Sequence, residues 1–204
     1  NLILNSHDVS SVSFVGSTPV AKYIYESSAK TGKRVQALGG AKNHLVVMPD
    51  ANLDQAVDGI IGAAYGSAGE RCMAVSVAVA VGDIADKLVD NINKKAEPLI
   101  VAPWTDSSSQ MGPVISEEHK NKIEDYIQSG LDEGAKLVLD GRDLKIQGYE
   151  NGYFVGPTLF DNVKKDMKIY KEEIFGPVLC VIRARNYDEA LNLVNNHAFG
   201  NGTS

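Results

Sequence analysis

One of the two cysteines in this sequence has neighbours that could make its sulfur a nucleophile. Cys72 follows the small-residue run 66–69 and stands directly after Arg71. The thiolate is the reactive form of cysteine, and a guanidinium and the backbone N–H groups of a turn favour that form. The alternative for any free cysteine is a small buried apolar side chain. Cys180 supports only this alternative, because it lies inside an apolar run.

A second stretch could bind an anion. Residues 16–19 read Gly-Ser-Thr-Pro, and proline suits the first position of a helix. The free N–H groups and the positive end of a helix dipole attract phosphate, although Ser17 could equally be an ordinary helix cap. The four histidines show no ligand spacing with one another or with the cysteines, so we expect no metal site.

The elements that must position these residues alternate between strand and helix patterns. The run 75–81 is continuously apolar and rich in valine, which is typical of a strand covered on both faces. The alternation predicts an α/β fold, a three-layer α/β/α arrangement around a mostly parallel sheet. We expect strands near residues 12–14, 34–38, 45–48, 75–81, 136–139 and 178–182, and helices over 19–30, 52–65, 83–95, 117–131 and 187–195.

Composition excludes several classes of partner. The 204 residues carry a formal net charge of -6, so no diffuse positive field recruits nucleic acid or an anionic membrane surface. The longest strongly apolar stretch, residues 74–81, is far shorter than the roughly 20 residues of a membrane-spanning helix. Two cysteines so far apart are no disulfide framework and favour a reducing compartment, the cytoplasm or the mitochondrial matrix. The first residues resemble neither a start nor a secretory signal, so we expect a piece of a longer protein.

Several motifs, in order along the chain, resemble those of the aldehyde dehydrogenase superfamily. Residues 69–72, Gly-Glu-Arg-Cys, are similar to its nucleophile motif, and Ala-Leu-Gly-Gly at 37–40 resembles its Glu-Leu-Gly-Gly segment. Finer details at 40–44, 70–74 and 148–152 most resemble the coenzyme A-acylating members that oxidise methylmalonate semialdehyde. The remaining similarities are the cofactor-contacting turn at 14–18, the Gly-Pro stretches at 111–113 and 156–158, and the second cofactor motif at 172–177.

The resemblance implies a role for each matching residue. Cys72 attacks the aldehyde of a small semialdehyde and keeps a thioacyl group after hydride has passed to NAD. Arg71 holds the distal carboxylate of the substrate, its alternative being a solvent-facing or structural ion-pair arginine. The implied NAD contacts are the turn at Gly16, Ser17 at the pyrophosphate, the backbone of Leu38 and Gly39 beside the nicotinamide, Glu173 at the ribose hydroxyls, and Phe175 near the ring.

One departure from the superfamily pattern bears on the second half of the reaction. Hydrolytic relatives use the glutamate of Glu-Leu-Gly-Gly to activate water, and this chain has Ala37 there. A methyl group accepts no proton, so the thioacyl group should wait for the thiol of coenzyme A as co-substrate. In the competing interpretation, Glu70 or Glu173 takes over as the base.

The resemblance also implies how the chain is divided. Residues 1–40 would be the C-terminal part of the NAD-binding domain and 41–204 a catalytic domain truncated at its C-terminal end, with the boundary near residues 38 to 42. We expect the whole protein to be a homo-oligomer, dimer or tetramer, and this chain alone to be inactive. Three other classes stay open: a hydrolytic semialdehyde dehydrogenase, a cofactor-free cysteine acyltransferase or hydrolase in which His44 activates Cys72, and a non-catalytic fold module.

Overall fold

A computed structural model describes the whole chain, residues 1–204. The chain divides into two compact units, Asn1–Ala41 and Lys42–Ser204. The division falls beside the boundary expected from the sequence, while the assignment of the first unit to an NAD-binding domain stays a prediction. No helix combines the length and the apolar character that crossing a membrane requires.

The first unit is a strand–helix–strand unit that follows a short helix. Strand β1 and strand β2 pair in parallel, with Phe14 opposite Ala37, and helix α2 connects them. Pro19 lies in the first turn of α2, as expected for a residue that lacks an N–H and has a fixed φ. The bounds are α1 Leu2–Asn5, β1 Ser11–Val15, α2 Thr18–Lys30 and β2 Arg34–Leu38.

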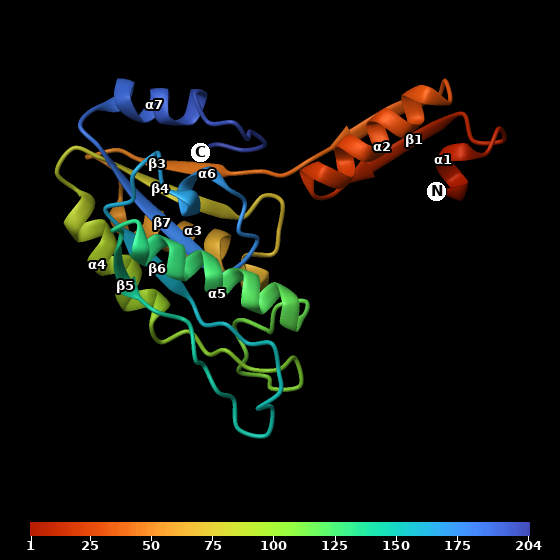
Figure 1. The fold of residues 1–204 in the computed structure, drawn as a ribbon. Helices are drawn as coiled ribbons and strands as arrows, with labels where there is room; N and C mark the ends of the chain where they lie inside the picture. The colour runs from red at the N-terminus through yellow and green to blue at the C-terminus, as the bar shows by residue number, and fades with distance from the viewer. The chain divides into compact units, whose positions relative to one another are not determined.

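The second unit is built on a five-stranded sheet with the order β3-β4-β7-β6-β5 (Figure 1). All neighbouring strands are parallel except β5 and β6, so the prediction of a mostly parallel sheet is confirmed. Strand β4 is buried at every position but Ser76, which explains its continuous apolar run. The bounds are β3 Asn43–Val47, β4 Val75–Val81, β5 Lys136–Leu139, β6 Thr158–Asp161 and β7 Val178–Ala184.

Helices flank this sheet on both faces. Side chains alternate along a strand, so Cys180 and Arg183 of β7 point to opposite faces. The Cys180 thiol donates to the carbonyl of Ile169 in α6, 3.6 Å away, and the Arg183 guanidinium reaches Asp86 of α4 at 2.7 Å. The helices α4 and α6 therefore cover opposite faces. The bounds are α3 Leu53–Tyr65, α4 Ala85–Ala96, α5 Glu117–Asp132, α6 Lys168–Lys171 and α7 Tyr187–Asn195, with a 3-10 turn at Gly66–Gly69.

Side-chain caps set where the longer helices begin. Asn52, Ser116 and Asn186 each accept a hydrogen bond from the backbone N–H three residues later, at the starts of α3, α5 and α7. Fully buried apolar side chains from α3, α4 and α5 then pack on the sheet as one core. The fold thereby fixes the loops that enter the strands, where the candidate site lies.

Candidate active site

The segments that enter β3, β4 and β7 meet at one edge of the sheet. These strands are adjacent and parallel, with Asn43 opposite Val75 and Val77 opposite Cys180. A Cβ built on Gly69 would overlap the carbonyl of Gly176, so the two backbones are in direct contact. The φ of Gly69 is +69°, a second reason why only glycine fits there. The nucleophile motif and the second cofactor motif, about a hundred residues apart, are thus neighbours.

Cys72 lies in a tight turn between α3 and β4. The two residues Ser67 and Ala68 adopt left-handed backbone conformations, with φ of 53° and 52°, which non-glycine residues rarely do. The N–H of Ala74 then donates to the carbonyl of Arg71 at 3.0 Å and closes the turn around Cys72. The Cys72 side chain is exposed, and its own N–H makes no hydrogen bond within the protein. A sulfur and an available N–H donor therefore belong to the same exposed residue.

Two side-chain amides hold the carbonyl of Cys72. Asn43 Nδ2 donates to it at 2.9 Å, and Asn201 Nδ2 donates to it at 2.8 Å. Neither asparagine was expected at the site from the sequence. No local pattern could have indicated them, because Asn201 lies 129 residues from Cys72 along the chain.

The predicted substrate ligand Arg71 folds back on the end of α3. Its Nη2 donates to the carbonyl of Gly62 at 2.7 Å, and the guanidinium lies so close to Gly66 that a Cβ there would overlap it. The residue is still exposed. One nitrogen of the Arg71 guanidinium is thus held by the backbone. Carboxylate binding by Arg71 stays a prediction.

A buried lysine fixes the backbone just before Glu173. The Lys42 ammonium donates to the carbonyls of Ile169 and Glu172 at 2.7 and 2.8 Å. Burial lowers the pKa of Lys42 from its ordinary value, against the opposing attraction of nearby acidic groups. The Tyr126 hydroxyl holds the Glu172 side chain at 2.7 Å. The cofactor roles of Glu173 and Phe175 stay predictions, on a loop whose main chain is fixed from two sides.

An acid–imidazole contact links the nucleophile motif to Phe175. Glu70 Oε1 accepts from the N–H of Ile115 at 3.2 Å and lies 3.4 Å from His119 Nε2. The same His119 nitrogen donates to the carbonyl of Phe175 at 2.6 Å. Phe175 has a φ of 62°, so this bond helps to hold a strained conformation. Sequence reasoning did not single out His119, and it considered Glu70 only as an alternative base.

The cofactor residues of the first unit lie together at the start of α2. The N–H of Gly16 donates to the carbonyl of Leu38 at 3.1 Å, and the N–H of Gly40 donates to Thr18 Oγ1 at 2.9 Å. Ser17 occupies the N-cap position, but its side chain makes no capping hydrogen bond. Ser17 thus holds the position of a helix cap without making the capping bond, and its role at the pyrophosphate stays a prediction. A free hydroxyl and unpaired helix N–H groups fit the pyrophosphate of NAD.

His44 does not contact Cys72. Its Nδ1–H donates to the carbonyl of Lys42 at 3.0 Å, and Nε2 lies 3.1 Å from the Tyr170 hydroxyl. Its ring also packs edge-on against His197, with the centroids 5.2 Å apart. Both nitrogens are engaged away from the thiol, so the interpretation in which His44 activates Cys72 lacks the hydrogen bond it requires.

The buried His44 predicts a pH dependence of stability. Burial, with His197 as the second cause, lowers the pKa of His44 to about 4. The unfolded chain takes up this proton near pH 6.5, so the free energy of unfolding should fall as the pH drops from 6.5 towards 4. We expect a loss on the order of 1–2 kcal/mol between about pH 7 and about pH 5, measured by urea unfolding. In His44→Asn this part of the pH dependence should disappear; its persistence would contradict the assignment.

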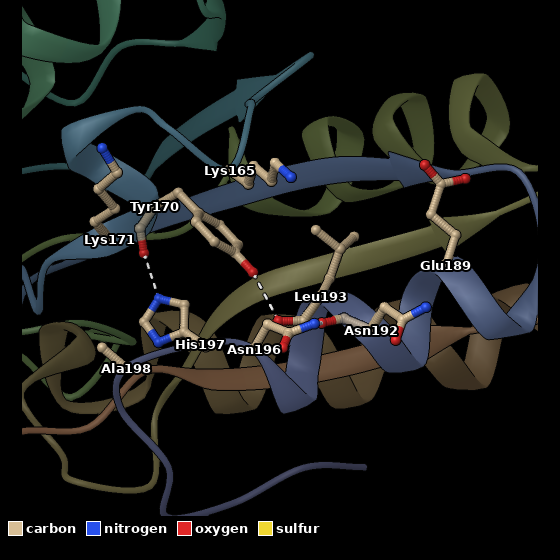
Figure 2. A pocket seen from close by; sticks show the side chains of 9 residues that line it. All are labelled: Lys165, Tyr170, Lys171, Glu189, Asn192, Leu193, Asn196, His197 and Ala198. Carbon is tan, nitrogen blue, oxygen red and sulfur yellow. Dashed lines mark hydrogen bonds between the residues drawn. The ribbon is translucent and has the colours of Figure 1, made fainter.

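A separate hollow of about 430 Å³ lies beside α6 and α7. Figure 2 shows His197 bonded to the carbonyl of Tyr170, and the Tyr170 hydroxyl bonded to the carbonyl of Leu193, within its wall. Neither Cys72 nor any other predicted site residue lines this hollow. It is therefore distinct from the candidate active site.

Comparison with known proteins gives consistent matches along the chain. The profile described as "Aldehyde dehydrogenase family" matches residues 1–204. A malonate-semialdehyde dehydrogenase 2 of Geobacillus thermodenitrificans is 57% identical over 203 residues, 99% of this chain and 42% of the relative. The sequence is 53% identical to a methylmalonate-semialdehyde dehydrogenase from Oceanimonas doudoroffii, whose crystal structure matches with a TM-score of 0.96. It is 58% identical to a putative methylmalonate-semialdehyde dehydrogenase from Sinorhizobium meliloti, whose crystal structure, complexed with NAD, matches with a TM-score of 0.97. Each of these two matches covers 98% of this chain and 41% of the other.

Proposed function

This chain belongs to the aldehyde dehydrogenase family, and from that premise we propose that it carries the nucleophile of an NAD-dependent, coenzyme A-acylating malonate- or methylmalonate-semialdehyde dehydrogenase. The names of the similar proteins support the substrate, and the NAD complex of one of them supports the cofactor. The chain spans about two fifths of the length of these relatives, so the activity is that of the whole protein. The observation that carries the proposal is the exposed Cys72 in its strained turn, beside the loop of Glu173 and Phe175.

The first step is the nucleophilic attack of Cys72 on the aldehyde. After the thiol has lost its proton to water, the sulfur attacks the aldehyde carbon, and the unpaired N–H of the same residue donates to the new oxyanion. Arg71 binds the distal carboxylate of the substrate through the donors that Gly62 does not occupy. This contact selects a 3-oxo acid over an unsubstituted aldehyde.

Each unit carries residues whose motifs resemble cofactor contacts of the family. In the first unit, Ser17 and the start of α2 would bind a pyrophosphate, beside the turn of Gly16, Leu38 and Gly39. In the second unit, Glu173 would receive ribose hydroxyls and Phe175 would pack near the nicotinamide ring. NAD, when bound, supplies the acceptor for the hydride that leaves the carbon attached to sulfur. What remains on Cys72 is a thioester.

The thioester loses carbon dioxide before it leaves the enzyme. Its carbonyl is β to the carboxylate, so it accepts the electron pair of the breaking C–C bond, and protonation of the carbon gives an acetyl or propionyl group. The thiol of coenzyme A then attacks, forming acetyl- or propionyl-coenzyme A and freeing the Cys72 thiol. Ala37 supports this route over hydrolysis, because it leaves no carboxylate at the family's position for a base.

A trapping experiment tests the proposal. The whole protein, incubated with malonate semialdehyde and NAD but no coenzyme A, should accumulate an acetyl group on the peptide that contains Cys72, as seen by mass spectrometry. Addition of coenzyme A should remove the group and yield acetyl-coenzyme A. Rapid release of free acetate without coenzyme A would favour the hydrolytic alternative. The absence of any adduct on Cys72 would refute the nucleophile itself.

A further inference from the structure

Two amide side chains from distant parts of the chain converge on one oxygen of the nucleophile residue. We propose that Asn43 and Asn201 form an amide clamp that positions Cys72 for attack, an inference that rests on the proposed role of Cys72. Both amides donate to the Cys72 carbonyl, at 2.9 and 2.8 Å. They act through Cys72 and are positioning residues.

The clamp fixes the one peptide of the turn that the backbone leaves unpaired. The bond from Ala74 N–H to Arg71 carbonyl closes the turn and orients the peptide before Cys72. The peptide after Cys72 depends on its carbonyl, whose two lone pairs accept from the two amides. With both flanking peptides held, the backbone of Cys72 is fixed, and with it the direction of the Cα–Cβ bond that carries the sulfur.

The side-chain amide of Asn43 is held in one orientation. It is buried, and its Nδ2 also donates to the carbonyl of Ala74 at 2.8 Å. Its Oδ1 accepts from the N–H of Gly202 at 2.9 Å. A flipped amide would place its oxygen against two carbonyl oxygens, so this orientation is the only one that satisfies the group. Asn43 thus joins the start of β3, the nucleophile turn and the segment that carries Asn201.

Asn201 offers a clean test because its φ is 117°, in the region that favours glycine. Asn201→Gly therefore removes the amide and leaves the backbone unstrained. We measure the rate of alkylation of Cys72 by iodoacetamide in the whole protein, with peptide mapping by mass spectrometry to follow this thiol alone. Loss of one donor should slow the reaction about fivefold, the equivalent of one typical hydrogen bond, at an unchanged unfolding temperature. Cys180 is buried with its pKa raised to about 11 and serves as the unreactive reference.

The matched control is Asn196→Gly. The Asn196 amide also donates to a backbone carbonyl, that of Asn192 at 2.9 Å, at the end of α7. This variant should alkylate at the wild-type rate. Equal rates for wild type and Asn201→Gly, or equal slowing in both glycine variants, would overturn the clamp.

Asn201→Asp separates positioning from a general structural role. The carboxylate has the size of the amide but opposes the Cys72 carbonyl with an acceptor, so alkylation should slow by more than in Asn201→Gly. In turnover, kcat should fall while the KM for NAD stays unchanged, and a changed KM with an unchanged kcat would overturn the proposal. The proposed function fails separately, if wild-type Cys72 alkylates no faster than a cysteine in a short peptide.

Discussion

Replacement of Cys72 by alanine should abolish the formation of NADH by the whole protein, with a fall in rate of roughly four orders of magnitude or more. In the proposed reaction, the Cys72 sulfur forms the first bond to the substrate carbon, and every later step acts on the group bound to this sulfur. The exposed turn offers no second thiol, because the other cysteine is fully buried in β7. The measurement is the absorbance of NADH with malonate semialdehyde, NAD and coenzyme A all present.

Serine at position 72 should be nearly as inactive as alanine. A hydroxyl needs a base to become a nucleophile, and the ring of His44 is engaged elsewhere. Cys180→Ala is the control, since this thiol is buried in the core, its one hydrogen bond is to the carbonyl of Ile169, and it should be dispensable for turnover. A Cys72→Ser protein that keeps a substantial fraction of the wild-type rate would refute the mechanism.

Introduction of glutamate at position 37 should give the whole protein a hydrolytic activity. Ala37→Glu supplies a carboxylate where hydrolytic members of the family have one, and a general base accelerates attack by water about a hundredfold or more. Release of free acetate without coenzyme A should rise accordingly, measured as NADH formed in its absence. Ala37 is only half buried at the end of β2, so the strand can accept the longer side chain.

Ala29→Glu is the matched control for this gain of function. It adds the same charge to the same unit, but on the exposed surface of α2. Its dependence on coenzyme A should equal that of the wild type. The account of Ala37 would be wrong if the wild-type enzyme released acid at full speed without coenzyme A, or if Ala37→Glu still required it.

Most helices and strands of this fold can be predicted from the sequence. The helix predicted over 187–195 agrees with α7, because its helical period follows the capping residue Asn186. The strand predicted over 75–81 agrees with β4, because a continuous apolar run is typical of a strand covered on both faces. Strand β6 is not predicted, since Thr158–Asp161 directly follows Gly-Pro and has polar residues at both ends, whereas the equally short β5 contains the apolar run Leu-Val-Leu. The helix α6 is not predicted either, because its four residues are too few to show a helical period.

The candidate site is only partly predictable from the sequence. Cys72, Arg71 and Glu173 lie in local motifs, so their types and neighbours alone are enough to indicate a role. Asn43, Asn201 and His119 act through partners that only the parallel sheet brings near, and an isolated asparagine or histidine gives no signal of such a partner. Lys42 likewise reads as a surface charge until its burial between α6 and the sheet is known.

The position of Cys72 at the amino ends of the strands has an electrostatic consequence. In a strand–helix–strand crossover, the helix returns antiparallel to the strands, so its carbonyl end lies at this edge. The last turn of α3 therefore presents partial negative charge towards the turn that carries Cys72, the proposed nucleophile. The guanidinium of Arg71, seated on the Gly62 carbonyl, neutralises that end of the helix. This cation therefore offsets the negative end of the helix before any substrate arrives.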